Sequence, residues 1–218
     1  MEPGLNELLK WSVENSSTTA NDSDAAPPTN RGLNPDALSA LFGGPSDADL
    51  MVESMTAIQD PSLPLSEKMI AFDNFEQLIE NLDNANNLGP LALWTPLLQC
   101  LENEEGDIKR MAAWCVGTAV QNNEKSQERL LAMGGIEKLV KLVVDGTQSE
   151  SVRRKGVYAL SSAVRNYQPS MDVLTGELGK LGREEQGRKI DASDMDACDE
   201  LIGALREEAK SAKESNGA

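Results

Sequence analysis

The residues that could carry covalent or metal chemistry are few in this chain of 218 residues. It contains no histidine, so no imidazole is present to act as a general base or metal ligand, and triads built on histidine are excluded. Its three cysteines, Cys100, Cys115 and Cys198, lack the even count of a disulfide framework and the paired spacing of a zinc site. Cys100 and Cys115 fall on apolar helical stripes, where a free cysteine packs as a small apolar side chain. We therefore predict no catalytic residue, no metal and no cofactor.

Two further groups match known ligand sites only in part. The acidic cluster Glu102, Glu104, Glu105 and Asp107 lacks the ligand spacing of a calcium loop, which favours a solvated loop. Residues 179–182 read Gly-Lys-Leu-Gly, but the full spacing of a phosphate loop and a preceding strand are missing. We expect no binding of ATP or ADP by the chain alone.

Basic and aromatic residues at equivalent helical positions indicate protein binding. The chain has 20 basic and 36 acidic residues, a net charge of −16, which argues against nucleic acid or an anionic membrane as partner. A basic stripe in such a chain suits an acidic protein surface; its members are Lys109, Arg110, Arg153, Arg154, Lys155 and Arg165. The alternative is that Arg110 and Arg154 bridge to neighbouring repeats or solvate helix ends. Trp114 and Tyr158 share one repeat position, as core residues or as binding anchors.

The elements that position these residues are predicted to be helices. Phe75, Leu78, Ile79 and Leu82 stand at i, i+3, i+4 and i+7, and Ser66 could cap the start of that helix. Further helices are expected at residues 47–59, 91–101, 125–133 and 136–144. No segment alternates with the period of a strand, so the fold is predicted to be all-α.

An internal repeat predicts how the helices are arranged. A shift of 44 residues pairs Ile108 with Val152, Arg110 with Arg154, Trp114 with Tyr158, Ala119 with Ala163 and Asn122 with Asn166. A fainter copy places Glu80 and Asn81 in register with Gln121 and Asn122. A period near 44 is typical of armadillo or HEAT repeats, whose units stack to bury their apolar faces. We therefore expect a short armadillo-like α-solenoid whose concave groove is the partner surface.

The repeats are expected between a flexible N-terminal arm and a C-terminal cap helix. We predict an arm with short helices over residues 1–60, the repeat domain over 61–175, a glycine-containing linker over 176–190 and the last helix over 191–213. Within the arm, residues 15–34 are too poor in apolar side chains to order. Ser193 is the expected cap of the last helix, whose apolar stripe is Cys198, Leu201, Ile202, Leu205 and Ala209.

Several runs of residues resemble one known family. They are Leu-Leu-Lys-Trp-Ser at 8–12, Ala-Leu-Phe-Gly-Gly at 40–44, Ala-Phe-Asp-Asn-Phe-Glu at 71–76, Leu-Ile-Glu-Asn-Leu-Asp-Asn-Ala-Asn-Asn at 78–87 and Gly-Thr-Ala-Val-Gln-Asn-Asn at 117–123. Together they resemble the armadillo-type nucleotide exchange factors of seventy-kilodalton heat-shock (Hsp70) chaperones, the Fes and HspBP group. The resemblance covers residues 5–170 and is closest to the fungal members.

The resemblance implies a co-chaperone that is not an enzyme. Such a protein binds one lobe of the Hsp70 ATPase domain and speeds ADP release, while its arm helps clients leave the peptide-binding domain. The positions that carry the contact are then Asn81, Asp83, Asn84, Ala85, Asn86, Arg110, Trp114, Asn122, Arg154, Tyr158, Arg165 and Asn166. Ala85 is expected in an exposed polar turn, where its small side chain allows close approach of the partner. We expect a cytoplasmic monomer; a peptide-binding armadillo adaptor and a scaffold remain the alternatives.

Overall fold

The computed structural model describes residues 43–183 and 186–210. The chain divides into two compact units, Met1–Ser46 and Asp47–Ala218. The unit boundary therefore lies before the helix at 47–59, which the sequence analysis assigned to the arm. The part of the predicted arm up to residue 42, including the stretch 15–34 that was expected to be flexible, lies outside the described residues.

The described part of the second unit consists of helices and their connections, and no strand occurs in it, which confirms the predicted all-α class. The helices are α3 (Asp47–Gln59), α4 (Leu65–Ile79), α5 (Leu82–Asn87), α6 (Trp94–Cys100), α7 (Gly106–Val120), α8 (Glu124–Ala132), α9 (Gly135–Val144), α10 (Glu150–Val164), α11 (Gln168–Lys180) and α12 (Met195–Lys210). Within these ranges, none of the helices combines the length and the apolar character that crossing a bilayer requires.

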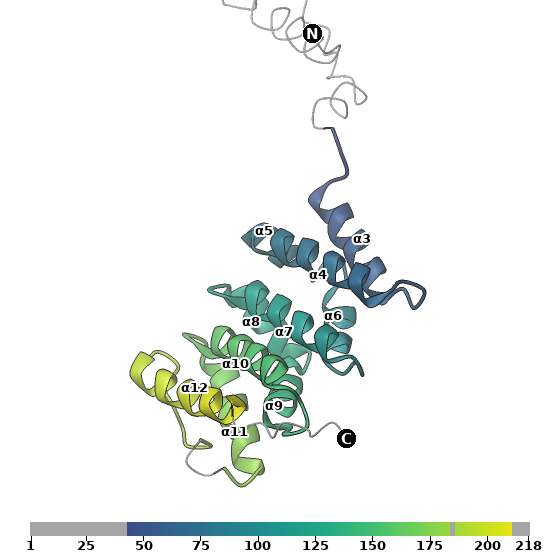
Figure 1. Cartoon of the computed structure of the whole chain (residues 1–218). Helices are drawn as coiled ribbons and strands as arrows, with labels where there is room; N and C mark the ends of the chain where they lie inside the picture. Colours follow the sequence, from purple (N-terminus) through teal and green to yellow (C-terminus); the bar gives the residue numbers. More distant parts are fainter. Residues whose placement is uncertain (1–42, 184–185, 211–218) are drawn as a thin grey trace, which may run out of the picture. The chain divides into compact units, whose positions relative to one another are not determined.

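Four helices of this unit, α4, α7, α10 and α12, lie side by side in chain order, and we call them the ladder helices (Figure 1). α7 packs against α4 and α10, and α10 packs against α7 and α12. Between successive ladder helices the chain passes through α5 and α6, then α8 and α9, then α11. This three-helix unit is the armadillo-like repeat that the sequence period predicted.

The repeat is regular at the level of single residues. α10 begins 44 residues after α7, at Glu150 against Gly106, and both helices are 15 residues long. α4, which begins 41 residues before α7, has the same length. Asn122 and Asn166 follow α7 and α10 at equivalent positions, and both take left-handed backbone angles, with φ of 52° and 57°. Asparagine tolerates this conformation better than most residues do, so the two asparagines share one turn.

The core of the second unit is built from the apolar stripes of the helices. Phe72, Phe75, Val116 and Leu160 are fully buried on three successive ladder helices. The three cysteines are free and buried among them, as predicted. Burial raises the pKa of the Cys100 thiol to about 11 and that of Cys115 well above its ordinary value. These thiols stay protonated and act as apolar packing groups.

Helix ends were predicted less well than helix interiors. α4 begins at Leu65 with Pro64 in the N-cap position, so the assignment of Ser66 as its cap is wrong. α11 continues through Gly176 and Gly179, so the predicted linker from residue 176 starts inside a helix. At Gly176 nothing lies within 4 Å of where a Cβ would stand, so this glycine marks neither a turn nor a close contact.

The last helix has the predicted apolar stripe but a different cap. Cys198, Leu201, Ile202, Leu205 and Ala209 are all buried, as the spacing indicated. Asp194, however, accepts a hydrogen bond from the backbone N–H of Ala197 at 3.1 Å, while the Ser193 hydroxyl donates to Asp191. Asp194 is therefore the residue that caps α12.

Candidate protein-binding face

Two hollows open on the exposed side of the ladder helices and share Tyr158. The first, of about 400 Å³, is lined by Glu76, Glu80, Trp114, Thr118, Gln121, Asn122 and Tyr158, from α4, α7 and α10 and the turn after α7. The second, of about 630 Å³, is lined by Arg110, Ser151, Arg154, Lys155, Tyr158, Arg206, Glu207 and Lys210, from α7, α10 and α12. We call the residues that line these two hollows the ladder face.

An aromatic pair lies where the two hollows meet. The Lys155 Nζ lies 3.6 Å from the centroid of the Trp114 ring and 5.6 Å from that of Tyr158. The Tyr158 hydroxyl donates to the Gln121 amide oxygen at 3.1 Å. Both aromatic residues are half-buried, so each packs partly on its neighbours and keeps part of its surface exposed. The structure thus gives both aromatic residues a packing role and leaves part of each ring accessible.

The environment of Lys155 weakens its hold on the proton. Burial against the rings lowers its pKa, and the positive charge of Arg110 lowers it further, whereas Glu76 acts in the opposite direction. A desolvated cation next to aromatic rings has lost much of its hydration already. Lys155 therefore loses less on binding an acidic partner than a fully hydrated lysine would.

Two close contacts fix the geometry of the first hollow. Glu76 is only 6% exposed and accepts a hydrogen bond from the Thr118 hydroxyl at 2.7 Å, which joins α4 to α7. Gly117 lies under Tyr158: a Cβ at this position would stand 2.4 Å from the Tyr158 ring. The glycine thus lets α10 approach α7 closely enough for the tyrosine to lie between the hollows.

The second hollow gathers positive charge in an acidic protein. Its cations are Arg110, Arg154, Lys155, Arg206 and Lys210. Three of them have a carboxylate on their own helix: Asp107 lies 3.3 Å from Arg110, Glu150 lies 3.4 Å from Arg154, and Glu207 lies 2.7 Å from Lys210. Exposed pairs of this kind are weak and exchange readily for a partner's carboxylate. The hollow therefore suits an acidic protein surface.

The ion pairs of Arg110 and Arg154 lie within their own helices, whereas two other residues of the basic stripe, Arg153 and Arg165, bridge between elements. Arg153 is 2% exposed; its Nε donates to the Val143 carbonyl at 2.7 Å and its guanidinium lies 3.3 Å from Glu208. Arg165 donates to Asp199 of α12 at 2.5 Å and to the Ser161 hydroxyl at 3.1 Å. Neither side chain lines a hollow.

The asparagines of the two equivalent turns differ in their surroundings. Asn122 lines the first hollow. Asn166 is exposed, and its backbone N–H donates to the Ala192 carbonyl at 2.9 Å, outside both hollows.

The run from Asn81 to Asn86 forms the start and body of α5, away from both hollows. Asn81 caps α5 by accepting from the backbone N–H groups of Asp83 at 2.9 Å and Asn84 at 3.4 Å. Asn84 is buried and donates to Asp47 at 2.8 Å and to the Leu78 carbonyl at 3.0 Å. Ala85 is 2% exposed and belongs to the core. The expectation that Ala85 lies in an exposed turn is therefore wrong, whereas Asn81, Leu82 and Asp83 of this run are exposed at the surface.

Asn86, the last residue of this run, lines a separate hollow of about 450 Å³. Trp94, Lys125 and Arg129 also line it, so it lies between α5, α6 and α8. The Asn86 side-chain oxygen is buried and lacks a hydrogen-bond partner in the structure.

Sequence reasoning missed part of the ladder face. Glu76, Thr118, Gln121, Ser151, Arg206 and Lys210 line the hollows. Arg206 and Lys210 stand at i and i+4 on the polar side of α12, a spacing that could have identified them once α12 was treated as a further ladder helix. Glu76 gave no such signal, since it is a buried acid whose partner lies 42 residues away.

The acidic cluster that was considered as a cation site contributes an inter-helix contact instead. Glu102 lies 2.5 Å from Lys138 of α9. Within residues 43–183 and 186–210, no group of three or more acidic or cysteine side chains is placed to hold a metal ion.

The chain is similar to known proteins over most of its length. The chain matches the family model of the nucleotide exchange factor Fes1 over residues 5–88 and that of the SIL1/FES1/HPBP1 C-terminal domain over residues 84–181. It is 58% identical to the Hsp70 nucleotide exchange factor FES1 of Gibberella zeae, over 94% of this chain and 97% of that one. The corresponding protein of Neurospora crassa is 51% identical, over 97% and 100%, and that of Coccidioides immitis 48%, over 95% and 99%. The resemblance found in the sequence is thus confirmed, and the chain belongs to the Fes1 family of nucleotide exchange factors.

Proposed function

We propose that this chain is a nucleotide exchange factor for an Hsp70 chaperone, binding its ATPase domain and accelerating the release of ADP. The observation that carries the proposal is the high identity, over almost the whole length of both chains, to relatives named as Hsp70 exchange factors. In this role the chain makes and breaks no covalent bond. The absence of histidine and the burial of the cysteines fit that role.

The ladder face is the surface that we assign to the ATPase domain. Trp114 and Tyr158 offer large, half-buried rings as anchors, and the five cations of the second hollow attract carboxylates of the partner. Of the residues expected from the sequence, Arg110, Trp114, Asn122, Arg154 and Tyr158 lie on this face. Arg165 and Asn166 line neither of its hollows, and neither do Asn81, the cap of α5, and Asp83 of α5.

The action follows from the stiffness of a packed helical stack. Successive ladder helices bury one another's apolar stripes, so the face keeps its shape when a partner binds. A lobe of the ATPase domain must fit this rigid face in order to bind it. If the lobe fits only in the position that opens the nucleotide cleft, binding leads to the release of ADP. The chain then stabilises the open state of the chaperone by binding it preferentially.

We extend the proposal to the N-terminal segment and to the cellular setting. The segment before residue 47, included in the Fes1 family match, would contact the peptide-binding domain and help clients leave. The chain would act as a monomer in the cytoplasm, where its net charge of −16 opposes self-association.

The test is a stopped-flow measurement of ADP release. An Hsp70 ATPase domain from a filamentous fungus is loaded with a fluorescent ADP analogue and mixed with excess ATP and increasing amounts of the full chain. We expect release to accelerate at least about tenfold and to saturate, as binding to one site requires. An unchanged release rate at saturating concentrations of the chain would rule the proposed function out.

A further inference from the structure

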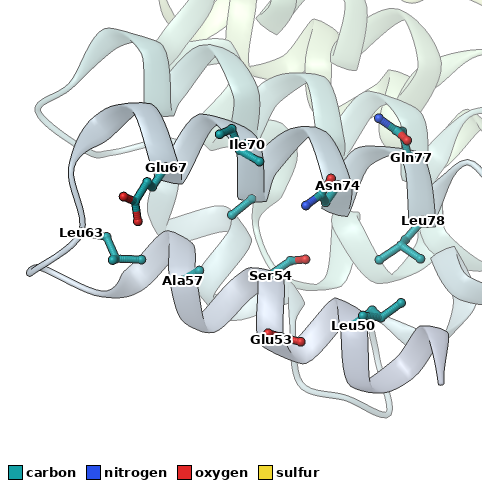
Figure 2. Close-up of a pocket in the computed structure, with 11 residues that line it drawn as sticks. Leu50, Glu53, Ser54, Ala57, Leu63, Glu67, Ile70, Asn74, Gln77 and Leu78 are labelled. Atoms are coloured by element: carbon teal, nitrogen blue, oxygen red, sulfur yellow. The ribbon is translucent and has the colours of Figure 1, made fainter. Parts of the chain in front are cut away.

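A further opening lies between α3 and α4, outside the ladder face. This α3–α4 groove has a volume of about 670 Å³. Its side chains come from α3, α4 and the connection between them and include Leu50, Leu63, Ile70 and Leu78, together with Glu53 and Glu67 (Figure 2). The groove thus combines apolar and acidic groups.

Comparison with the later repeats shows that α4 has an exposed face at this groove. Asn74 of α4 is equivalent to Cys115 of α7 and Ala159 of α10, both of which are fully buried, whereas Asn74 is exposed. Ile70 is 60% exposed, while its equivalent in α7, Met111, is 2% exposed. α7 and α10 each pack between two ladder helices, but in the described part of the chain no ladder helix precedes α4. α3 packs against α4 instead, and among the described residues it leaves Ile70 and Asn74 exposed.

The acidic residues around the groove favour a partner that carries basic side chains. Residues 47–80 contain eight acidic residues and a single basic one, Lys68. Glu53 and Glu67 line the groove and are exposed. An apolar helix flanked by lysine or arginine would cover the apolar side chains and place its cations opposite these carboxylates.

We propose that the α3–α4 groove is a second protein-binding site, which takes an amphipathic helix with basic residues beside its apolar face. The helix lies in the groove along α3 and α4, so its apolar side chains at i, i+3, i+4 and i+7 contact Ile70 and Leu78. The site is separate from the ladder face, and it does not depend on the proposed exchange function.

The test uses a fluorescein-labelled peptide of about 18 residues, long enough to form a helix, with leucines on one face and lysines on its flanks. Fluorescence anisotropy with the full chain is expected to show saturable binding that weakens as salt rises. Ile70→Glu should lower the affinity at least about tenfold, because it places a charge in the apolar contact. Leu181→Glu is the matched control: Leu181 is 54% exposed, far along the chain, and this change should leave binding unaltered.

Two further arms separate this site from general attraction of a cation to an acidic protein. Glu67→Gln should weaken binding and reduce its salt dependence, whereas a scrambled peptide of the same composition, which has no apolar face, should not bind. Equal binding of the scrambled peptide, equal affinity of the Ile70→Glu chain, or no binding at all would overturn the proposal. So would a concentration-dependent dimer in sedimentation that Ile70→Glu abolishes, because the occupant would then be a second copy of the chain.

Discussion

At the scale of single residues, Lys155 connects the two halves of the ladder face. It lies against Trp114 and Tyr158, and the neighbouring Arg110 and Glu76 act on its pKa in opposite directions. The sequence placed Lys155 in a basic run but gave no reason to prefer it to Arg153, the buried member of that run. The difference arises from helix geometry: Arg153 points to α9 and Glu208, and Lys155 points to the rings of the ladder face.

The first prediction concerns this lysine. Lys155→Met keeps the length of the side chain and removes its charge, so the contact with the rings stays apolar while the attraction to a partner carboxylate is lost. We expect the free energy of unfolding to change by less than about 1 kcal/mol and the acceleration of ADP release to fall at least about fivefold. Urea unfolding and stopped flow measure the two quantities; full acceleration by a normally folded variant would remove Lys155 from the interface.

Ala85 gives a second prediction, which follows from its burial. An arginine there must enter the core between α5 and its neighbours, so Ala85→Arg should destabilise the fold by at least about 2 kcal/mol. Asp83→Arg, on the exposed side of the same short helix, is the control and should melt like the parent. Thermal melts by circular dichroism decide the point: an Ala85→Arg chain that melts normally would contradict the burial of this residue.

The sequence could not show the burial of Ala85, and the reason is local. Its neighbours Asp83, Asn84, Asn86 and Asn87 are all polar, and no apolar spacing marks the helix. Asn84 is buried because its amide finds partners at Leu78 and at Asp47, 37 residues away. The spacing of apolar residues does not reveal a contact between residues so far apart in the sequence. A short polar helix such as α5 is therefore predicted to be an exposed turn.

At the scale of elements, Gly117 sets the distance between α7 and α10. A Cβ at Gly117 would meet the Tyr158 ring at 2.4 and 2.6 Å. Gly117→Ala should therefore destabilise the fold by about 1–3 kcal/mol, because overpacking exceeds the gain in helix propensity. Gly203 in α12 is the matched control: it has open space around it, so Gly203→Ala should stabilise by about 0.5–1 kcal/mol. Denaturant unfolding of both variants tests the pair, and a stabilised Gly117→Ala chain would contradict this packing.

Helix α12 is held to the stack by a group of charges around Glu208. Arg183 donates to both carboxylate oxygens of Glu208, and the buried Arg153 lies 3.3 Å away. The hydrogen bonds from Arg183 hold the pKa of Glu208 below its ordinary value of 4.5, and the charges of Arg183 and Arg153 add to this. Since the folded-state pKa is lowered, the carboxylate stabilises the fold above the ordinary value, and this contribution is lost as pH falls from 4.5 through the lowered pKa.

The corresponding prediction is a change in the pH dependence of stability. Glu208→Gln should cost about 2 kcal/mol at pH 7, where the charged hydrogen bonds are intact in the parent, and less at a pH below the lowered pKa. Thermal melts of parent and variant across this range measure the difference. A difference in melting temperature that stays constant down to the acid end would show that Glu208 does not clamp α12.

At this scale the sequence predicted the interiors of helices better than most of their ends. The stripe of α12 and the range of α3 were predicted correctly because burial imposes a regular spacing. The start of α4 at Leu65, the cap of α12 and the continuation of α11 through Gly176 and Gly179 depend on local backbone conformation and on tertiary packing, which one sequence does not display.

At the scale of the whole molecule, the repeat brings residues that are far apart in the sequence together on one surface. Arg110 and Arg154, 44 residues apart in the sequence, line the same hollow because α7 and α10 are adjacent rungs with the same register. The period therefore predicted both the fold and the first members of the ladder face. It did not extend to α12, whose Arg206 and Lys210 complete the hollow, because α11 and the connection after it obscure the repeat.

The most direct test of the ladder face as the exchange site is the rate of ADP release from an Hsp70 ATPase domain, measured with charge-reversed variants of this chain. Arg154→Glu and Arg206→Glu each place a carboxylate in the second hollow, whereas Arg129→Glu makes the same change in charge on α8, outside the ladder face. We predict that the first two variants melt like the parent and lose at least about tenfold of the acceleration, which is about 1.4 kcal/mol of binding, and that Arg129→Glu retains it. Equal acceleration by all three, or a loss confined to Arg129→Glu, would contradict the ladder face as the site of exchange.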